Sequence, residues 1–528
     1  MSYASHLGQG NVPQTEALPG QVKNSAGGFA YAVDDWVRLD RFLVLGAEGG
    51  SYYAGERKLT LENAAVVGRC AGADWKRTVD QIVAVSDAGR AVKNEPALMA
   101  LAIVAKKSSA EGRAYALAAL PKVARIGTHL FHFAEYVKAL GGWGRGTRRA
   151  VGDWYRDMPA ERLALQAIKY QQRDGWSHRD VLRKAHPKTD DATKNAVLYW
   201  MVNGWESVGE VPHEDDVLAT IWAFERAKTA RGKDLVKLIT DYGLPHECVP
   251  NKAKGDPEVW AAMLPHTGLT AIIRNLGKMT SVGLIKSLSD AARIVAKKLR
   301  DVEALKKGRV HPLSLLVAMN VYARGFGDKG SLTWSPVQGV VDALDEAFYL
   351  AFKAVEPTGK RHLLALDVSG SMTWTEIAGM PDVTPRVGAA AMSLVTANVE
   401  EESAFVGFAN GISELAISAR QRLDDVVRYT NNFPAGGTDC ALPMIWALEN
   451  RVKVDVFCIY TDSETWAGKV HPKVALEVYR QKMGIPAKLA VIGMVSNGFS
   501  IADPTDAGQM DVCGFDTSTP AVLADFAR

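Results

Sequence analysis

The 528-residue sequence predicts a multidomain α + α/β molecule, in which a helical body precedes a doubly wound α/β domain. From about Leu59 to about Ala351, apolar residues recur at three- and four-residue spacing, the period of an amphipathic helix. After Lys360 the pattern changes to short apolar runs, such as HLLALDVS and VDVFCIYTD, separated by helical stretches. This alternation predicts a parallel sheet covered on both faces, with the domain boundary close to residues 356–361.

The chain divides into three segments. Residues 1–28 are rich in Gly, Pro, Gln and Asn and are predicted to form an extended N-terminal arm. Residues 29–355 carry too many short helices to surround one core, whereas stacked helix pairs need only neighbouring contacts. Because no clean repeat is visible, a solenoid of degenerate repeats is inferred from the number of helices, and two compact all-α domains are the alternative. Residues 361–528 form the α/β domain.

The charge is divided unevenly between these parts. The formal net charge is only +3, but residues 361–528 hold 13 basic and 20 acidic side chains, which leaves 49 against 39 for residues 1–360. A basic body suggests a polyanionic partner for that part of the chain. Apolar residues make up 47% and charged residues 23% of the sequence, a composition that excludes disordered or collagen-like chains.

The compartment is predicted from what the sequence lacks. It has no run of about 18 apolar residues, and its first residues have no basic start followed by an apolar core. Neither a membrane span nor a secretory signal is therefore expected. The five cysteines are scattered without a CxxC pair, which predicts reduced thiols in a cytoplasmic protein, with no disulfide framework or zinc site.

A set of oxygen ligands is predicted in the α/β domain. Asp367, Ser369 and Ser371 end the first strand, Thr438 lies in a later loop, and Asp462 ends a subsequent strand. Loops at the carboxyl ends of parallel strands converge on one crevice. Hydroxyl and carboxylate oxygens suit a hard cation such as Mg²⁺. We expect the two serines and the threonine to be direct ligands, and the two carboxylates to bind directly or through water.

Two alternatives compete with this metal site. Ser and Asp also cap helices in strand–helix turns. A metal hydrolase is conceivable in principle, but Ser369 lacks a G-x-S-x-G setting and no complete G-x-x-x-x-G-K-[ST] sequence is present. We therefore do not expect an enzyme.

Three segments of the helical body combine cations with aromatic rings: residues 122–133, 142–149 and 169–188. Arg and Lys bind phosphates, and aromatic rings stack on the exposed bases of single-stranded RNA. Lys169, Gln172 and Arg173 fall within about one helical turn and could share one face, where His186 could join them. The alternative is a solvated charged surface. For three tryptophans and two histidines we favour packing inside the body: Trp143, Trp154, Trp176, His129 and His132.

Together these segments resemble the Ro autoantigen family, whose helical part is called the TROVE module. The resemblance rests on RFLVLGAEGGSYY at residues 41–53 and continues through ARIGTHLF, WGRGTRRAVGDWY, KYQQRDGWSHRDVLRKAHPK, LTAIIRNLGKMT, HPLSLLVAMNVYARG and VEPTGKRHLLALDVSGSM. The D-x-S-x-S sequence with the later Thr and Asp resembles the metal-ion-dependent adhesion site of a von Willebrand factor A domain. The length suits a bacterial relative.

The resemblance implies a ring of HEAT-like helical repeats closed by a Rossmann-like A domain. In the family, the basic outer surface binds Y RNA, a small noncoding RNA, and the central hole accepts single-stranded ends of misfolded or unprocessed RNAs. By motif, Lys169, Gln172, Arg173 and His186 correspond to Y RNA contacts, whereas Arg125, Arg145 and Arg148 are candidates for other phosphate contacts. Gly146–Thr147 is expected to interrupt a stretch that is more continuously helical in relatives.

Two functions follow as hypotheses. The first is a ribonucleoprotein subunit in RNA quality control, stability or maturation under stress, with an exoribonuclease as a partner tethered by the RNA. The second is a protein-interaction scaffold, because the family's adhesion site leaves a coordination position open for a partner's carboxylate.

Overall fold

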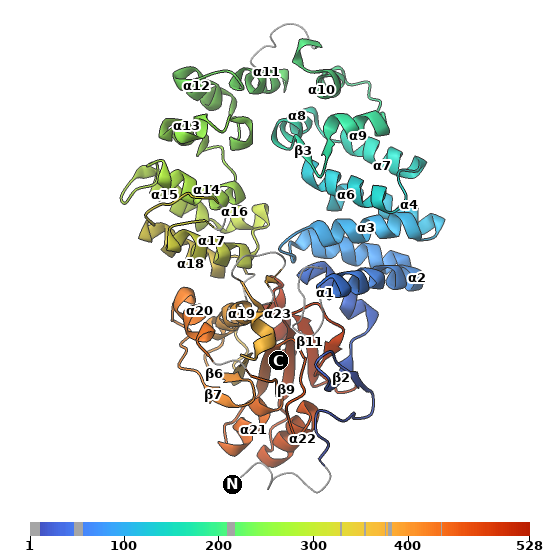
Figure 1. Ribbon diagram of the computed structural model, residues 1–528, viewed down its shortest axis with the longest axis vertical. Coiled ribbons are helices and arrows are strands. Elements are labelled where there is room, and N and C mark those ends of the chain that lie inside the picture. Colours follow the sequence, from blue (N-terminus) through green and yellow to red (C-terminus); the bar gives the residue numbers. More distant parts are fainter. Residues whose placement is uncertain are drawn as a thin grey trace.

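The helical body forms two columns: one leads away from the α/β domain, and the other leads back to it (Figure 1). The computed structural model describes residues 11–46, 56–207, 217–327, 330–352, 355–374, 376–377, 383–433 and 436–528. The motif at residues 41–53 is thus described only as far as Gly46, and its remainder lies outside these ranges. Among the described residues, no helix is long and apolar enough to cross a membrane.

The first column contains α1 to α10 and a short hairpin. Its elements are α1 (Asp35–Leu45), α2 (Glu56–Ala88), α3 (Glu95–Lys107), α4 (Ala110–Ala118), α5 (Leu120–Val123), α6 (Gly127–Ala139), α7 (Arg145–Arg156), α8 (Ala160–Lys169), β3 (Gln172–Arg173), β4 (Trp176–Ser177), α9 (His178–Ala185) and α10 (Ala192–Asn203). α2 is kinked at Asp74, whose carboxylate accepts a hydrogen bond from the Arg77 N–H at 2.9 Å. Asp74 therefore caps the second half of α2.

The second column contains α11 to α18. Its helices are α11 (Val217–Ala227), α12 (Gly232–Tyr242), α13 (Pro257–Met263), α14 (Leu269–Ser281), α15 (Asp290–Leu299), α16 (Val302–Gly308), α17 (Pro312–Arg324) and α18 (Gln338–Leu350). In both columns most helices pack on those close to them in the chain, such as α2 on α3 and α17 on α18. The structure thus has the solenoid arrangement, because in two compact all-α domains the helices would pack around two separate hydrophobic cores.

The two columns meet at a seam beside the α/β domain. The Arg309 guanidinium, at the end of α16, donates to the carboxylate of Asp87 at 2.7 Å and to its carbonyl oxygen at 2.9 Å. The buried His311 ring lies 3.2 Å, through Nε2, from the Arg90 carbonyl oxygen. These contacts join residues more than 200 positions apart, so they close the helical arc.

The α/β domain contacts both ends of this arc. On the first column, Arg41 of α1 pairs with Asp511 at 2.6 Å. On the second, Asp342 of α18 pairs with Arg422 at 2.9 Å. The helical arc and the α/β domain together form a closed ring, as expected.

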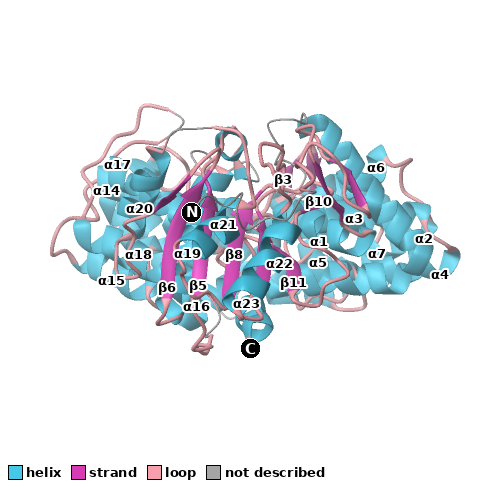
Figure 2. Cartoon of the chain, turned by 90° about the horizontal axis from the view of Figure 1, so that it is seen from below, coloured by secondary structure: helices cyan, strands magenta, loops and turns pink. Residues whose placement is uncertain are grey.

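A six-stranded sheet forms the centre of the α/β domain (Figure 2). Its order is β11-β9-β8-β5-β6-β7, and all neighbours are parallel except the antiparallel edge strand β7. The strands are β5 (His362–Asp367), β6 (Ser403–Phe408), β7 (Ile412–Glu414), β8 (Val456–Thr461), β9 (Lys488–Gly493) and β11 (Gln509–Cys513); the helices are α19 (Pro385–Val399), α20 (Leu423–Asn431), α21 (Leu442–Glu449), α22 (Pro472–Met483) and α23 (Thr519–Ala527).

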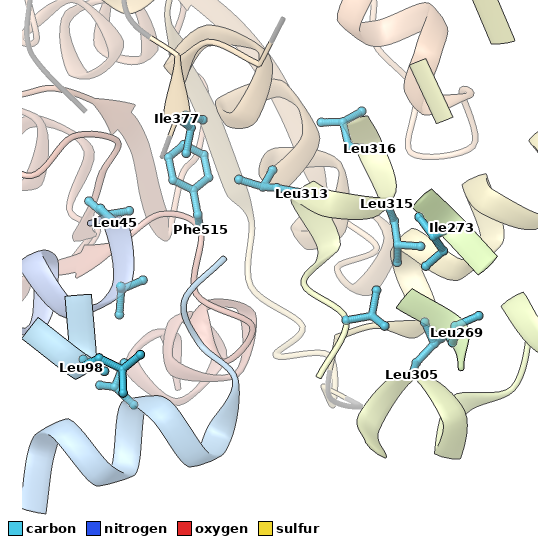
Figure 3. Close-up of a cluster of buried hydrophobic side chains, with 14 of the residues drawn as sticks. Leu45, Leu98, Leu269, Ile273, Leu305, Leu313, Leu315, Leu316, Ile377 and Phe515 are labelled. Atoms are coloured by element: carbon cyan, nitrogen blue, oxygen red, sulfur yellow. The ribbon is translucent and has the colours of Figure 1, made fainter. Parts of the chain in front are cut away.

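The two faces of the sheet bury different side chains, because successive residues of a strand point to opposite sides. Leu363 and Ala365 of β5 belong to the apolar cluster with α21 and α22. Leu364 and Leu366 belong to the cluster that includes α19, α23 and the helical body. Figure 3 shows Phe515 near Leu313 of α17 in this second cluster. The hydrophobic core is therefore continuous between the domain and the arc.

The described part of the N-terminal arm, residues 11–28, lies against the α/β domain. Its strand β1 (Gln21–Lys23) pairs with β2 (Phe29–Ala32), and β2 pairs with β10 (Phe499–Ser500). Both pairings are antiparallel. Because β10 belongs to the α/β domain, this three-stranded sheet joins the arm and the first residues after it to that domain before the chain enters α1.

Candidate RNA-binding surface and candidate metal centre

The cationic residues predicted in segment 169–188 lie on a hairpin. α8 ends at Lys169, and β3 pairs with β4 so that Gln172 faces Ser177 and Arg173 faces Trp176. The intervening Asp174 and Gly175 have φ of 52° and 74°, as a two-residue turn of this kind requires. The prediction that Lys169, Gln172 and Arg173 share one helical face is therefore wrong. α8 ends at Lys169, and the Asp-Gly turn reverses the chain after Arg173.

Helix α6 anchors this hairpin at two points. The buried Trp176 donates its indole N–H to Glu135 at 2.8 Å, and the His132 ring hydrogen-bonds to Asp174 through Nδ1. Trp143 stacks on Trp176 with ring centroids 5.7 Å apart. The aromatic residues thus pack within the body, which leaves the outward side chains of the hairpin accessible on a fixed support.

Gln172 and Arg173 are exposed, and Arg173 keeps 58% of its side-chain surface accessible. The nearest carboxylate to the Arg173 guanidinium is that of Asp174, at 3.7 Å. Lys169 is more enclosed, with its ammonium 3.8 Å from Glu247 and 5.4 Å from the centre of the Tyr170 ring. Arg173 therefore has the most accessible cation of this group.

His186 lies at the other end of α9, one helix length from the hairpin, or about 12 Å at 1.5 Å per residue. It is exposed, and its φ of 48° ends the helix in a left-handed turn. The hairpin and the end of α9 can thus contact one extended ligand along the same helix.

The three arginines predicted to make other phosphate contacts differ in accessibility. Arg145 and Arg148 are exposed on α7. Arg125 is partly buried and donates to Ser86 Oγ and the Lys122 carbonyl oxygen, both at 2.9 Å. Burial lowers the pKa of Arg125 to about 10. Arg125 therefore holds the first column together in this conformation, whereas Arg145 and Arg148 face solvent.

The expected interruption at Gly146–Thr147 is wrong, because α7 begins at Arg145 and continues through both residues to Arg156. A Cβ on Gly146 would lie 3.0 Å from the Leu117 side chain, so the glycine lets α7 approach α4 closely. Thr147 is buried on the same helix. The small residues serve packing and do not break the helix.

The predicted metal ligands gather at the carboxyl ends of β5 and β8, which are adjacent parallel strands. Asp367 ends β5, Ser369 and Ser371 lie in the turn that follows it, and Asp462 comes directly after β8. Thr438 lies in the loop between α20 and α21, where the nearby Gly436 carbonyl oxygen accepts from the Gly370 N–H at 3.2 Å. All five are buried.

Hydrogen bonds fix part of this cluster. Asp367 accepts from the Ser369 N–H at 2.9 Å and from the Thr461 hydroxyl at 2.6 Å. The Ser369 and Ser371 hydroxyl oxygens are 3.0 Å apart. Asp462 accepts from the Glu464 N–H at 3.0 Å through Oδ1. These bonds orient the side chains toward one another.

Two buried oxygens of the cluster have no hydrogen-bond partner among the described residues: Thr438 Oγ1 and Asp462 Oδ2. Buried polar atoms are rarely left unpaired, and a bound ion is one explanation for such a pair. Burial, followed by the charges of Asp367 and Glu464, raises the pKa of Asp462 well above its ordinary value, and burial also raises the pKa of Asp367. A cation would stabilise the ionised form of both carboxyl groups, so the residues fit a divalent metal.

The donor set is specific to a hard cation. Among the described residues, no group of three or more His, Cys, Asp or Glu side chains comes together to hold a metal, so this cluster depends on its hydroxyls. All five cysteines are buried and unpaired with one another. Hydroxyl and carboxylate oxygens suit Mg²⁺ better than a thiophilic ion.

Two supporting residues were missed by the sequence analysis. The Thr461 hydroxyl holds Asp367, and the buried Arg386 guanidinium donates to the Ser369 carbonyl oxygen at 3.2 Å. The sequence gives Thr461 a weak signal, since it directly precedes Asp462. It gives none for Arg386, whose contacts form only when α19 packs on β5.

An arc of helix pairs closed by an α/β domain with a D-x-S-x-S loop defines a TROVE-type protein with a von Willebrand factor A domain. The TROVE domain model matches residues 22–321, and the Ro60 vWA domain model matches residues 361–527. The chain is 47% identical over 522 residues to the RNA-binding protein RO60 of Deinococcus radiodurans, covering 98% of this chain and 97% of that protein.

A second relative is the RNA-binding protein RO60 of Caenorhabditis elegans, 36% identical over 584 residues and covering 96% and 90% of the two chains. The crystal structure of the Deinococcus radiodurans RO (RSR) protein superposes with a TM-score of 0.71 at 46% identity, covering 94% of this chain and 99% of that one. The chain belongs to the Ro60 family.

Proposed function

We propose that this protein binds a small, structured noncoding RNA on the exposed surface formed by the β3–β4 hairpin, α7 and α9. The observation that carries the proposal is the hairpin itself, because α6 fixes its backbone while Gln172 and the Arg173 cation remain exposed. A cation on a fixed backbone loses less conformational freedom when it meets a phosphate than one on a mobile loop. The two compared relatives are named RNA-binding proteins, which supports the same ligand class.

Lys169, Gln172, Arg173 and His186 are the proposed contacts to a Y RNA-like molecule, with Arg145 and Arg148 binding further phosphates. Arg125 is proposed for the same role, but its two hydrogen bonds would first have to break. The ring would take up single-stranded ends of misfolded or unprocessed RNAs. The protein itself is proposed to be non-catalytic and cytoplasmic.

The test is a titration with a structured RNA that carries a single-stranded 3′ tail, at about 50 and about 200 mM salt. Phosphate contacts release counterions, so affinity should fall steeply between the two conditions and the RNA should be recovered uncut. Arg173→Ala with His186→Ala should weaken binding about tenfold and reduce the salt slope by about one. RNA cleavage would instead indicate an enzyme.

The matched control is Arg420→Ala with Lys482→Ala. Both residues are exposed, but they lie on the α/β domain. This pair removes at least as much positive charge, so it reports any effect of net charge alone. Equal loss of affinity in both double variants would overturn the assignment to the hairpin and α9.

A partner exoribonuclease is proposed to associate through the bound RNA. Its co-purification with the full chain should then be lost after RNase treatment and in the Arg173→Ala, His186→Ala variant. Association that survives both would mean direct protein contact.

A second function, capture of a partner's carboxylate by a bound Mg²⁺, is favoured by the two unpaired oxygens of the cluster. Ser369, Ser371 and Thr438, with Asp367 and Asp462, would hold the ion, which would supply a positive charge for an acidic side chain. Thr438→Val keeps the side-chain shape but removes one unpaired oxygen. Because Thr438 is proposed as a direct ligand, Mg²⁺ affinity should fall by more than the roughly 10–100-fold that loss of an outer contact typically causes.

Thr373→Val is the matched control for that substitution. Its hydroxyl donates to the Gly370 carbonyl oxygen at 2.8 Å in the loop that carries Ser369 and Ser371, but it is exposed. Metal affinity should therefore be unchanged in this variant, and RNA affinity should be unchanged in both. Wild-type protein that binds no Mg²⁺ would overturn the metal centre.

A further inference from the structure

The N-terminal arm places one side chain, Gln14, deep inside the α/β domain. Gln14 is fully buried although it precedes every helix in the described part of the chain. Its amide nitrogen donates to the Asp439 carboxylate and to the Val470 carbonyl oxygen, both at 2.8 Å. Its amide oxygen accepts from the Gly468 N–H at 3.2 Å and from the Thr465 hydroxyl. The carboxamide therefore uses two donors and accepts two bonds.

These partners flank the two loops of the proposed metal centre. Asp439 directly follows Thr438, and Thr465 lies three residues after Asp462. The loops are also joined directly, since the Thr438 carbonyl oxygen accepts from the backbone N–H groups of Trp466 and Ala467, each at 3.0 Å. Gln14 thus lies across the junction between a loop that supplies a hydroxyl and a loop that supplies a carboxylate.

The arm contacts the second loop again further along the chain. Asn24 donates to the Thr465 carbonyl oxygen at 2.8 Å, and the Ala26 N–H donates to Glu464 at 3.1 Å. Glu464 is the residue whose own N–H holds Asp462. A Cβ on Gly28 would lie 2.0 Å from the Thr465 carbonyl oxygen, so the arm passes too close for any larger residue without displacing the loop.

We infer that the N-terminal arm, through Gln14, positions the loops that carry Thr438 and Asp462 and so sets the affinity of the metal centre for its divalent cation. Gln14 is a positioning residue and touches no metal. Groups that orient ligands from outside typically change metal affinity about 10–100-fold when they are lost. This inference rests on the proposed metal centre and adds to it a contribution from a distant part of the chain.

The main test compares Gln14→Met with Gln21→Met in the full chain. Methionine keeps much of the side-chain volume but removes the four side-chain hydrogen bonds of Gln14. Gln21 lies on the same arm but contacts His471 at 3.2 Å, at the far end of the second loop, where α22 begins and nine residues after Asp462. Titration with Mg²⁺, and with Mn²⁺ as a paramagnetic probe, should show at least about tenfold weaker binding for Gln14→Met and less than about twofold change for Gln21→Met.

Hydrogen exchange on the wild-type chain provides a test that requires no substitution. If the arm sets metal affinity, linkage requires that the metal also stabilise the arm. The Gln14 N–H, which donates to Gly468, and the Phe29 N–H, which donates to Gln14, should therefore exchange more slowly with Mg²⁺ than with EDTA. Slower exchange at these two amides supports the inference even if Gln14→Met does not fold.

The outcomes separate the two proposals. Wild-type protein that binds no divalent cation overturns the metal centre and the inference with it. Metal binding that is equal in wild type and folded Gln14→Met overturns only the role of the arm. Unchanged exchange of the arm amides on metal addition also overturns that role.

Discussion

The hairpin surface and the proposed metal centre place polar groups in opposite environments. At the hairpin, Gln172 and Arg173 are exposed, and the cation lies 3.7 Å from its nearest carboxylate. At the metal centre, Asp367, Thr438 and Asp462 are buried, and several of their oxygens are held by hydrogen bonds. RNA binding at the hairpin surface should depend on the number of charges that it presents. Metal binding at the proposed centre should depend on the position of each atom.

This difference predicts how each region tolerates change. An exposed charge is already solvated, so its removal costs little stability and only part of the ligand affinity. A buried polar group that loses its partner carries the full cost of its desolvation. Substitutions of buried polar groups in the α/β domain and at its junctions should therefore lower stability, whereas those at the hairpin should weaken binding.

The largest effect is expected at the buried junction between α1 and the α/β domain. Arg41 is 1% exposed; it donates to Asp511 at 2.6 Å and to the Phe499 carbonyl oxygen at 2.9 Å. Arg41→Ala would leave the carboxylate of Asp511, whose side chain is 9% exposed, without this partner. We expect the free energy of unfolding to fall by about 3–5 kcal/mol, measured by urea denaturation.

Arg309→Ala is the matched comparison for Arg41→Ala, since it breaks the ion pair with Asp87 at the seam. The two side chains of this pair are 37% and 68% exposed, so the cost should be below about 1 kcal/mol. Equal destabilisation by the two substitutions would contradict the distinction between buried and exposed junctions.

The next effect concerns acid stability of the helical body. Burial lowers the pKa of His178 and of His311 to about 4, and burial, followed by the charge of Arg125, lowers that of His129 to about 3. Between these values and the unfolded pKa of about 6.5, the unfolded chain binds more protons, so stability falls as the pH falls. At about pH 5.5 each histidine should cost about 1.4 kcal/mol relative to about pH 7.5 and above.

The measurement is urea denaturation of the full chain at about pH 7.5 and about pH 5.5. In the His178→Gln variant the difference between the two pH values should shrink by about the contribution of one histidine. Its absolute stability is expected to be lower at both, because the buried ring hydrogen-bonds to the Tyr155 hydroxyl at 2.8 Å. An unchanged pH difference would mean that this ring is not kept neutral by burial.

That the five proposed metal ligands lie together could be predicted from the sequence, but the groups that hold them could not. Asp367, Ser369 and Ser371 form a short motif, and the topology of a parallel sheet then brings Thr438 and Asp462 to it. Gln14 and Arg386 act through contacts between segments far apart in the chain, and no local pattern marks such contacts. The doubly wound sheet was predictable for the same reason as the ligands, because each strand is a local apolar run.

The hairpin shows the opposite case, in which a local signal was available and was outweighed. Apolar spacing up to Lys169 predicted a helix that continued through Arg173, whereas Asp174–Gly175 is a frequent sequence for a two-residue hairpin turn. The turn prevailed because Trp176 gains a buried site and a hydrogen bond to Glu135 when the chain reverses. Periodicity alone cannot weigh that tertiary contact against one more turn of helix.

The last effect concerns strain in the hairpin turn, which should change RNA affinity only modestly. Gly175 has φ of 74° and open space where a Cβ would lie, so Gly175→Ala adds backbone strain of about 1–2 kcal/mol without a steric clash. If the hairpin presents Arg173 in a fixed position, RNA affinity should fall by up to about tenfold while the salt slope stays unchanged, because no cation is lost.

Gly204→Ala is the control, since Gly204 also has a positive φ, of 89°, and open space where a Cβ would lie, but it ends α10, away from the hairpin. A reduced salt slope in Gly175→Ala would show that the turn changes the number of phosphate contacts, and equal affinity in wild type and both variants would show that RNA binding does not depend on a rigid hairpin.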